Sequence, residues 1–128
     1  MTTYADEIKQ HLGHTVTSLQ AAKSSLEKDQ YDLAASYAAE SAFHTATALL
    51  LDEEIEPGKH DDVITLIRQV FVDKRRLTKE QGEKLSWLFQ MRGRENSEAA
   101  APLILGEAQK AVEFAESFFE AAKVILEA

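Results

Sequence analysis

The most regular stretch of this sequence is AQKAVEFAESFFEAAKVIL, residues 108–126. Its apolar residues recur every three or four positions, so they would line one face of a helix. They are Ala108, Ala111, Val112, Ala115, Phe118, Phe119, Ala122, Ile125 and Leu126. This period predicts an amphipathic α-helix whose apolar face packs against other helices.

The same period recurs toward the start of the chain. Residues 4–28 carry one apolar stripe, and residues 31–54 carry a second that is rich in alanine. The alanines imply a close approach of neighbouring backbones. Proline lacks an amide hydrogen and disfavours helical geometry before it, so the segment around Pro57 is predicted to be a loop. A short helix then follows from Asp61 or Asp62 to Phe71.

A capping signal marks the next helix. Thr78 is followed three positions later by Gln81, a spacing typical of the capping box at a helix N-terminus. This pair predicts a helix that runs to about Arg94.

The last helix is predicted to open at Ser97, with Pro102 either at its first helical position or at a kink. The whole pattern comprises four long helices and one short helix with brief connections. It predicts an all-α, up-and-down antiparallel bundle that forms a single domain over residues 1–128.

The composition excludes several classes of protein. The chain has no cysteine, which removes disulfides, zinc ribbons and thiol nucleophiles. Its five glycines are never clustered, so no phosphate loop or dinucleotide fingerprint is present and no cofactor is expected. It shows neither a basic leader followed by an apolar run nor an apolar stretch near eighteen residues. We therefore expect no signal peptide, no membrane span and a cytoplasmic location.

The charge is unevenly distributed. Within the net charge of −8, residues 59–94 hold nine basic and five acidic residues, a local charge of +4, and the rest of the chain carries −12. This asymmetry predicts that the middle third meets anions. The alternative is that it is merely the less acidic part of the protein.

Arg92 is the most informative basic residue. At about 100° per residue it lies within about 20° of Leu85 on the core-facing stripe of the fourth helix, while Arg94 lies on the opposite side. A guanidinium there would lie at the mouth of the bundle and could make bidentate contact with a phosphate or a carboxylate. A structural salt bridge from Arg92 to a glutamate of a neighbouring helix is the alternative.

Trp87 and Met91 lie off the main stripe of the same helix. Two large apolar side chains there predict a second contact surface, most simply a homodimer interface.

Histidines raise the question of a metal. His11 and His14 are three residues apart, and Glu40 and His44 are four apart. A di-iron carboxylate bundle needs two Glu-x-x-His pairs and two further inward glutamates, and that set is missing, so no metal site is expected. The alternative roles are solvated positions for His11 and His14 and a hydrogen-bonded histidine at the core edge for His44.

The order and spacing of several runs resemble a known family. They are residues 33–51 (LAASYAAESAFHTATALLL), 56–64 (EPGKHDDVI), 71–72 (FV) and 88–92 (LFQMR). Together they are similar to the small stand-alone HEPN domain proteins (higher eukaryotes and prokaryotes nucleotide-binding). The resemblance implies a four- or five-helix bundle, commonly dimeric and often encoded beside a minimal nucleotidyltransferase. It also implies that many members are metal-independent ribonucleases or toxins that use an Arg followed four to six residues later by a His.

This sequence departs from that catalytic pattern. The positions at this spacing after Arg92 and Arg94 fall within residues 97–101 (SEAAA), which contain neither His nor Tyr. Without an imidazole or phenol there, no base for a ribose 2′-hydroxyl is evident and no catalytic residue is predicted. The residues predicted to bind a nucleotide or RNA are Lys59, His60, Arg68, Arg92, Arg94 and Asn96.

Three functions stay open at this point. The first is a non-catalytic binding module for a nucleotide, RNA or a nucleotidyltransferase partner. The second is a ribonuclease, the toxin of a toxin–antitoxin pair, in which His60 of the loop joins Arg92. The third is a structural helical dimerisation domain.

Overall fold

The computed structural model describes residues 3–92, Arg94 and residues 101–127, and only the backbone of residues 60 and 61. These residues form helices and connecting turns, with no strand among them. The elements are α1 (Ala5–Glu27), α2 (Tyr31–Asp52), α3 (His60–Ile67), the π-helical turn η1 (Arg68–Val72), α4 (Lys79–Phe89) and α5 (Leu105–Glu127). The predicted all-α bundle is confirmed.

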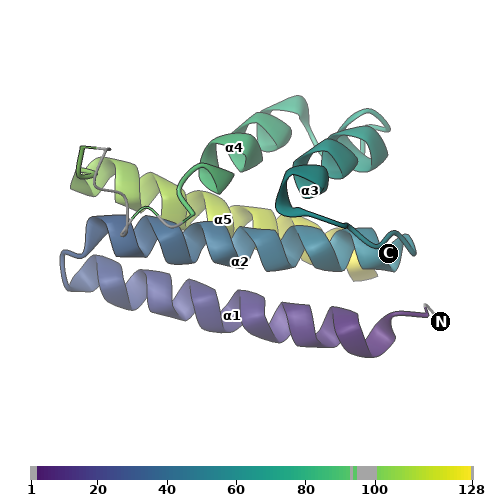
Figure 1. Ribbon diagram of the computed structural model, residues 1–128, viewed down its shortest axis with the longest axis horizontal. Coiled ribbons are helices and arrows are strands. Elements are labelled where there is room, and N and C mark those ends of the chain that lie inside the picture. The colour runs from purple at the N-terminus through teal and green to yellow at the C-terminus, as the bar shows by residue number, and fades with distance from the viewer. Residues whose placement is uncertain (1–2, 93, 95–100, 128) are drawn as a thin grey trace.

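Three long helices, α1, α2 and α5, run side by side, and the shorter α3 and α4 lie across them on one side (Figure 1). The helix α2 is central, since it contacts α1, α3, α4 and α5. It runs antiparallel to α1. In contrast, α5 runs in the same direction as α2, because α3, η1 and α4 together return the chain to the end where α2 began. None of the described helices has the length and apolar character needed to cross a bilayer.

The alanines of α2 explain its central place. Fourteen of its 22 residues are buried. Among them are seven fully buried alanines, Ala34, Ala35, Ala38, Ala39, Ala42, Ala46 and Ala48. Small side chains let α1 and α5 approach the α2 backbone closely, as the sequence predicted.

A buried polar seam joins α1 to α2. The Ser41 hydroxyl donates to the backbone carbonyl of Thr15 at 2.8 Å, and the hydroxyls of Thr15 and Thr45 lie 3.2 Å apart. All three side chains are fully buried. Because buried hydroxyls are costly unless they are hydrogen-bonded, this seam favours one register of α1 against α2.

The helix starts partly confirm the capping signals. The Thr78 hydroxyl accepts from the Gln81 amide at 3.0 Å, and Gln81 Oε1 accepts from the Thr78 amide at 2.8 Å, so the predicted capping box is present. The third helix begins at His60, slightly earlier than predicted. Its N-cap is Lys59, whose backbone amide donates to the Asp62 carboxylate at 3.2 Å.

The fourth helix is shorter than predicted. It ends at Phe89 rather than near Arg94, so the bundle has three long helices instead of four. After Phe89 the backbone tightens into turns in which the Met91 amide donates to the Leu88 carbonyl at 2.9 Å, and the Arg94 amide donates to the Met91 carbonyl at 3.1 Å.

The start of the last helix also differs from the prediction. Residues 101–104 are not helical, and α5 begins at Leu105, so Pro102 is neither its first residue nor a kink within it. The predicted start at Ser97 is wrong for the same reason, although Ser97 itself lies outside the described residues. Side chains cap the true start. Asp32 Oδ1 accepts from the Leu103 amide at 2.8 Å, and Glu107 Oε1 accepts from the Ile104 amide at 3.2 Å.

Candidate functional site

A hollow of about 390 Å³ lies between α1, α2 and the loop that precedes α3. We call it the α1/α2 hollow. Its described lining residues are Glu7, His11, Phe43, Thr47, Leu51, Glu56, Pro57, Gly58, Lys59 and Val63. Its size falls within the range of about 300–1,000 Å³ that is typical of ligand pockets.

Arg92 contacts Phe43, one of the residues that line this hollow. The Arg92 guanidinium carbon lies 4.5 Å from the centre of the Phe43 ring, and the Phe89 ring centre lies 5.9 Å from the same ring. Since Phe43 also lines the hollow, its ring connects the turn after α4 to the hollow. A cation stacked on an aromatic face is held in place by the ring.

Three histidines gather beside Phe43. The Nδ1 atoms of His11 on α1 and His44 on α2 lie 2.9 Å apart, so one of these imidazoles donates a hydrogen bond to the other. The His14 ring stacks on His44 with a centre distance of 4.9 Å, and the Phe43 ring meets His44 edge-on at 5.7 Å. The prediction that His44 is a hydrogen-bonded histidine at the core edge is confirmed. His14 is exposed, whereas His11 is half-buried rather than solvated.

This environment keeps two of the imidazoles neutral. Burial, together with the positive charges that His11, His14 and Arg92 can carry, lowers the pKa of His44 to about 4. Burial and the neighbouring His14 also lower the pKa of His11, while the Glu7 carboxylate acts in the opposite direction. Both rings are therefore neutral at neutral pH, and one of them uses its Nδ1 lone pair to accept the hydrogen bond from the other.

The lining of the α1/α2 hollow also includes two carboxylates. Glu7 and Glu56 line it together with Lys59. Tyr4 lies nearby, and the pKa of its phenol is raised by burial, by a hydrogen bond with Glu56 and by the acidic side chains around it. The hollow thus offers hydrogen-bond acceptors as well as cations.

Two of the predicted binding residues lie at or beside the α1/α2 hollow. Lys59 lines the α1/α2 hollow with Phe43, and Arg92 lies over the ring of Phe43. Neither Arg92 nor Arg68 is among the described residues that line the hollow, and Arg68 is exposed on η1. Whether any of them binds a ligand stays a prediction.

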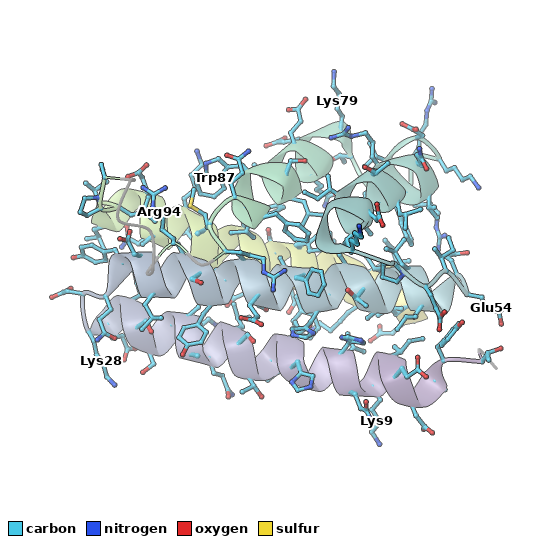
Figure 2. All side chains as sticks on the ribbon, viewed as in Figure 1. Lys9, Lys28, Glu54, Lys79, Trp87 and Arg94 are labelled. Carbon is cyan, nitrogen blue, oxygen red and sulfur yellow. The ribbon has the colours of Figure 1, made fainter. Side chains whose placement is uncertain are left out.

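Arg94 lies at the other end of the bundle (Figure 2). Its Nε atom is 3.9 Å from Asp32 Oδ1, and its guanidinium donates to the Ala101 carbonyl. Asp32 is at the start of α2, a helix about 33 Å long, and the α1/α2 hollow is near the end of α2. Arg94 is therefore separate from that hollow. The side chain of His60 and the whole of Asn96 lie outside the described residues.

The two residues predicted for a homodimer interface have different positions. Met91 is only 6% exposed and belongs to the core, so its predicted place on a second surface is wrong. The helical wheel fails there because α4 ends before Met91 and the following turn directs this side chain inward. Trp87 is half-buried beside α5, and its role in a homodimer stays a prediction.

In the part of the chain that the structure describes, no group of three or more His, Asp or Glu side chains is arranged to hold a metal ion. Sequence reasoning did not predict the cluster beside Arg92, which is formed by Phe43, His11 and His44. The sequence showed only that His11 and His44 lie on two separate helices. It did not show how those helices align, so it could not place the two side chains in contact.

Comparison with protein families matches residues 9–125 to the HEPN domain. The chain belongs to the HEPN domain family. This HEPN protein is also similar to a curated protein from Methanocaldococcus jannaschii named "Putative toxin MJ0142". The two are 27% identical over 106 residues, which cover 83% of this chain and 72% of the relative. Arg92, Phe43 and the three clustered histidines all lie within the HEPN match, whereas Glu7 precedes it.

Proposed function

We propose that this HEPN protein binds a phosphate-bearing ligand, a nucleotide or RNA, in the α1/α2 hollow. The observation that carries the proposal is the convergence at Phe43, which has Arg92 on its ring face and shares the hollow with Lys59 and His11. The Arg92 guanidinium on the Phe43 ring and the Lys59 ammonium in the same hollow can form charge-assisted hydrogen bonds to phosphate oxygens.

The rest of the hollow fits the remainder of a nucleotide. The carboxylates of Glu7 and Glu56 would repel a second phosphate, but they can accept hydrogen bonds from ribose hydroxyls. An aromatic ring such as Phe43 can in addition stack on a base or hold the cation that contacts its phosphate. A ribonucleotide supplies all three chemical groups, whereas inorganic phosphate supplies only one.

Binding of AMP and of a short oligoribonucleotide, measured at low and at moderate salt, tests this proposal. Replacing Arg92 with Ala should weaken binding about 5- to 150-fold, the scale of a lost pair of charge-assisted hydrogen bonds. The matched control is Lys79→Ala, which removes an exposed cation at the start of α4 and should only reduce the salt dependence modestly. Failure of both ligands to bind at low salt would leave the structural dimerisation domain as the better function.

A second candidate is metal-independent RNA cleavage, as expected of a toxin, and the His11–His44 contact favours it. A neutral His11 could take the proton of a ribose 2′-hydroxyl, whose oxygen then attacks the adjacent phosphorus. The 5′-oxygen leaves with a proton from solvent, which gives a 2′,3′-cyclic phosphate and a 5′-hydroxyl. Arg92 would stabilise the charge that develops on the phosphate. The relative named as a toxin supports this alternative, in which His11 takes the part first assigned to His60.

Incubation of RNA with the pure protein in EDTA separates the two candidates. Cleavage that is lost in both Arg92→Ala and His11→Ala would establish the ribonuclease. Binding without cleavage would establish the non-catalytic module.

Two partners also follow from family membership as proposals, a second copy of the chain and a minimal nucleotidyltransferase. The open reading frame beside the gene and co-purification of its product with this protein would test the second.

A further inference from the structure

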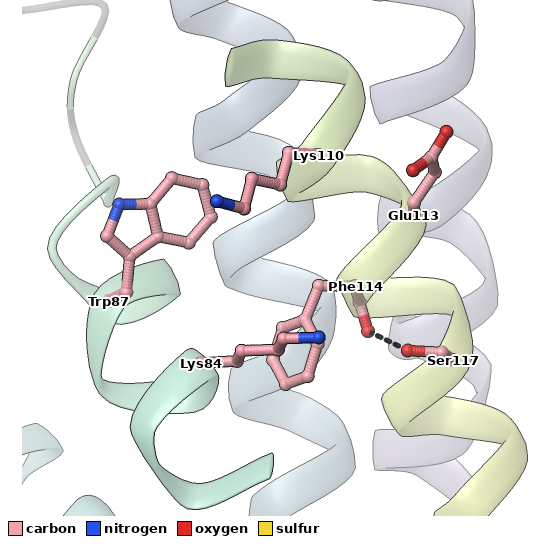
Figure 3. Close-up of a pocket in the computed structure, with 6 residues that line it drawn as sticks. All are labelled: Lys84, Trp87, Lys110, Glu113, Phe114 and Ser117. Carbon is pink, nitrogen blue, oxygen red and sulfur yellow. Dashed lines mark hydrogen bonds between the residues drawn. The ribbon is translucent and has the colours of Figure 1, made fainter. Parts of the chain in front are cut away.

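A second hollow, of about 230 Å³, lies between α4 and α5 (Figure 3). We call it the α4/α5 hollow. Its described lining residues are Lys84 and Trp87 from α4 and Lys110, Glu113, Phe114 and Ser117 from α5. Phe114 is buried and stacks on Phe118 of the core, so it forms a fixed apolar floor. The Ser117 hydroxyl donates to the Phe114 carbonyl at 3.0 Å and is already satisfied.

Two lysines cross this hollow in opposite directions. Lys110 extends from α5 until its Nζ atom lies 5.6 Å from the centre of the Trp87 ring on α4. Lys84 extends from α4 until its Nζ atom lies 5.8 Å from the centre of the Phe114 ring on α5 (Figure 3). The methylene groups of both lysines extend the apolar wall of the hollow, and both ammonium groups lie close to an aromatic ring.

These ammonium groups can pair with an incoming anion. Lys84 Nζ lies 2.9 Å from Glu80 Oε1, but this pair is one turn apart on the exposed face of α4 and is readily exchanged. In the region that the structure describes, Lys110 makes no ion pair, and its Nζ atom lies over the Trp87 ring. Glu113 is the one acidic residue among the described residues of the lining. The described lining of the α4/α5 hollow thus carries two lysines and one glutamate on a protein whose net charge is −8.

The size of the hollow decides which kind of ligand it fits. Its 230 Å³ is below the range of about 300–1,000 Å³ typical of pockets for whole small molecules. It can take one large apolar side chain against Phe114 and Trp87. Aromatic pockets with a charged rim are the usual receptors for such an anchor residue at protein interfaces.

We propose that the α4/α5 hollow is a docking site for a partner protein that inserts one large apolar side chain flanked by Asp or Glu. The apolar side chain packs on Phe114 and Trp87, while the flanking carboxylates bind Lys84 and Lys110. This surface is distinct from the α1/α2 hollow, because it lies between α4 and α5 and the described lining residues of the two hollows do not overlap.

Trp87 is the only tryptophan of the chain and reports directly on this hollow. The probe is the capped peptide Asp-Glu-Leu-Asp-Glu, titrated to millimolar concentration while the Trp87 fluorescence and the indole N–H resonance are followed. We expect a saturable change in both signals, which weakens as salt is raised. An Asn-Gln-Leu-Asn-Gln peptide and an Asp-Glu-Ala-Asp-Glu peptide should each bind several-fold more weakly.

The double variant Lys84→Gln, Lys110→Gln should weaken peptide binding at least about tenfold and remove most of its salt dependence. The matched control is Lys123→Gln on α5, because Lys123 Nζ also lies over an aromatic ring, 4.8 Å from the centre of Phe119, but outside this hollow. Its affinity should stay within about twofold of wild type. All three lysines are at least partly exposed, so far-UV circular dichroism should show folded variants.

Four outcomes would overturn the docking site. They are no response of Trp87 at millimolar peptide, equal binding of the uncharged peptide, an equal loss in Lys123→Gln, and a Trp87 signal that follows protein concentration without peptide. The last would show that a second copy of the chain covers the hollow. An AMP-induced change at Trp87 that is stronger than the peptide's would assign the hollow to nucleotides. None of these results depends on whether Arg92→Ala weakens RNA binding, so this proposal and the proposed function can fail separately.

Discussion

His11 and His44 join α1 to α2 through their Nδ1 atoms, which lie 2.9 Å apart. Only one of two imidazoles in such a pair can donate, so the arrangement needs at least one of them neutral. His14 and Arg92 add further positive charge close to His44. The contact therefore links the protonation state of this cluster to the packing of the two helices.

We expect the free energy of unfolding to fall as the pH is lowered from about 6.5 to about 4. Within this window the unfolded chain protonates the His44 position at its ordinary pKa of 6.5, whereas the folded protein holds it neutral down to a pKa of about 4. The loss should be about 1–2 kcal/mol, because the side chain is partly exposed and the full shift is screened by solvent. Urea unfolding at pH 7.5 and 4.5 measures it.

Carboxylates also titrate near pH 4, so the informative quantity is the difference between variants. His44→Gln keeps a polar group opposite His11 but does not titrate, and it should show a smaller loss between the two pH values than wild type. His14→Gln removes an exposed imidazole from the same cluster and should stay closer to wild type. Equal pH dependence in wild type and His44→Gln would mean that His44 is protonated without cost.

The polar seam beside this pair should contribute measurably to stability. Ser41→Ala removes the 2.8 Å hydrogen bond from the buried hydroxyl to the Thr15 carbonyl and should cost about 1–2 kcal/mol. Ser24→Ala, on the exposed surface of α1, should change the unfolding free energy by less than about 0.5 kcal/mol. Chemical denaturation of both variants at pH 7.5 gives the comparison. Similar values for the two would show that the seam adds no net stability.

A local signal predicted the start of α4 but not its end, and the predicted start of α5 was wrong. The Thr78–Gln81 capping box is complete within four residues, so the sequence was sufficient to find it. The end of α4 has no such marker. A helical-wheel projection that continued past Phe89 placed Met91 on the surface. The helix ends at Phe89, and the following turn directs the Met91 side chain into the core.

The candidate site was predictable in part. The charge of residues 59–94 and the resemblance to HEPN proteins pointed to Lys59 and Arg92. Lys59 lines the α1/α2 hollow, and Arg92 lies over the ring of Phe43, which also lines it. The contact between His11 and His44 depends on the register of α1 against α2. Buried seam hydrogen bonds contribute to this register, and helical periodicity does not reveal it.

Lysine substitutions at Trp87 and Met91 should distinguish a surface residue from a core residue. Met91→Lys buries an ammonium among apolar side chains and should unfold the protein or lower its stability by several kcal/mol. Trp87→Lys should retain most of the helicity, because the indole is only half-buried. If the predicted homodimer uses Trp87, sedimentation at micromolar concentration should report a dimer for wild type and a shift toward monomer for Trp87→Lys. Complete unfolding of Trp87→Lys would instead place this residue in the core.

Phe43→Leu should weaken nucleotide or RNA binding without a large loss of stability. Leucine fills most of the same volume on α2 but offers no ring face, so the Arg92 guanidinium loses the surface 4.5 Å away that holds it at the hollow. A cation–π contact at a partly exposed site is worth about 0.5–1 kcal/mol, which predicts about a 2- to 5-fold weaker affinity.

The matched control is Phe119→Leu, since Phe119 has the same kind of contact with Lys123 on α5, away from the α1/α2 hollow. Isothermal titration with AMP should show the change in Phe43→Leu alone. An equal loss in both variants would mean that the effect comes from the bundle as a whole, and unchanged affinity in Phe43→Leu would mean that the stack does not position Arg92 for the ligand.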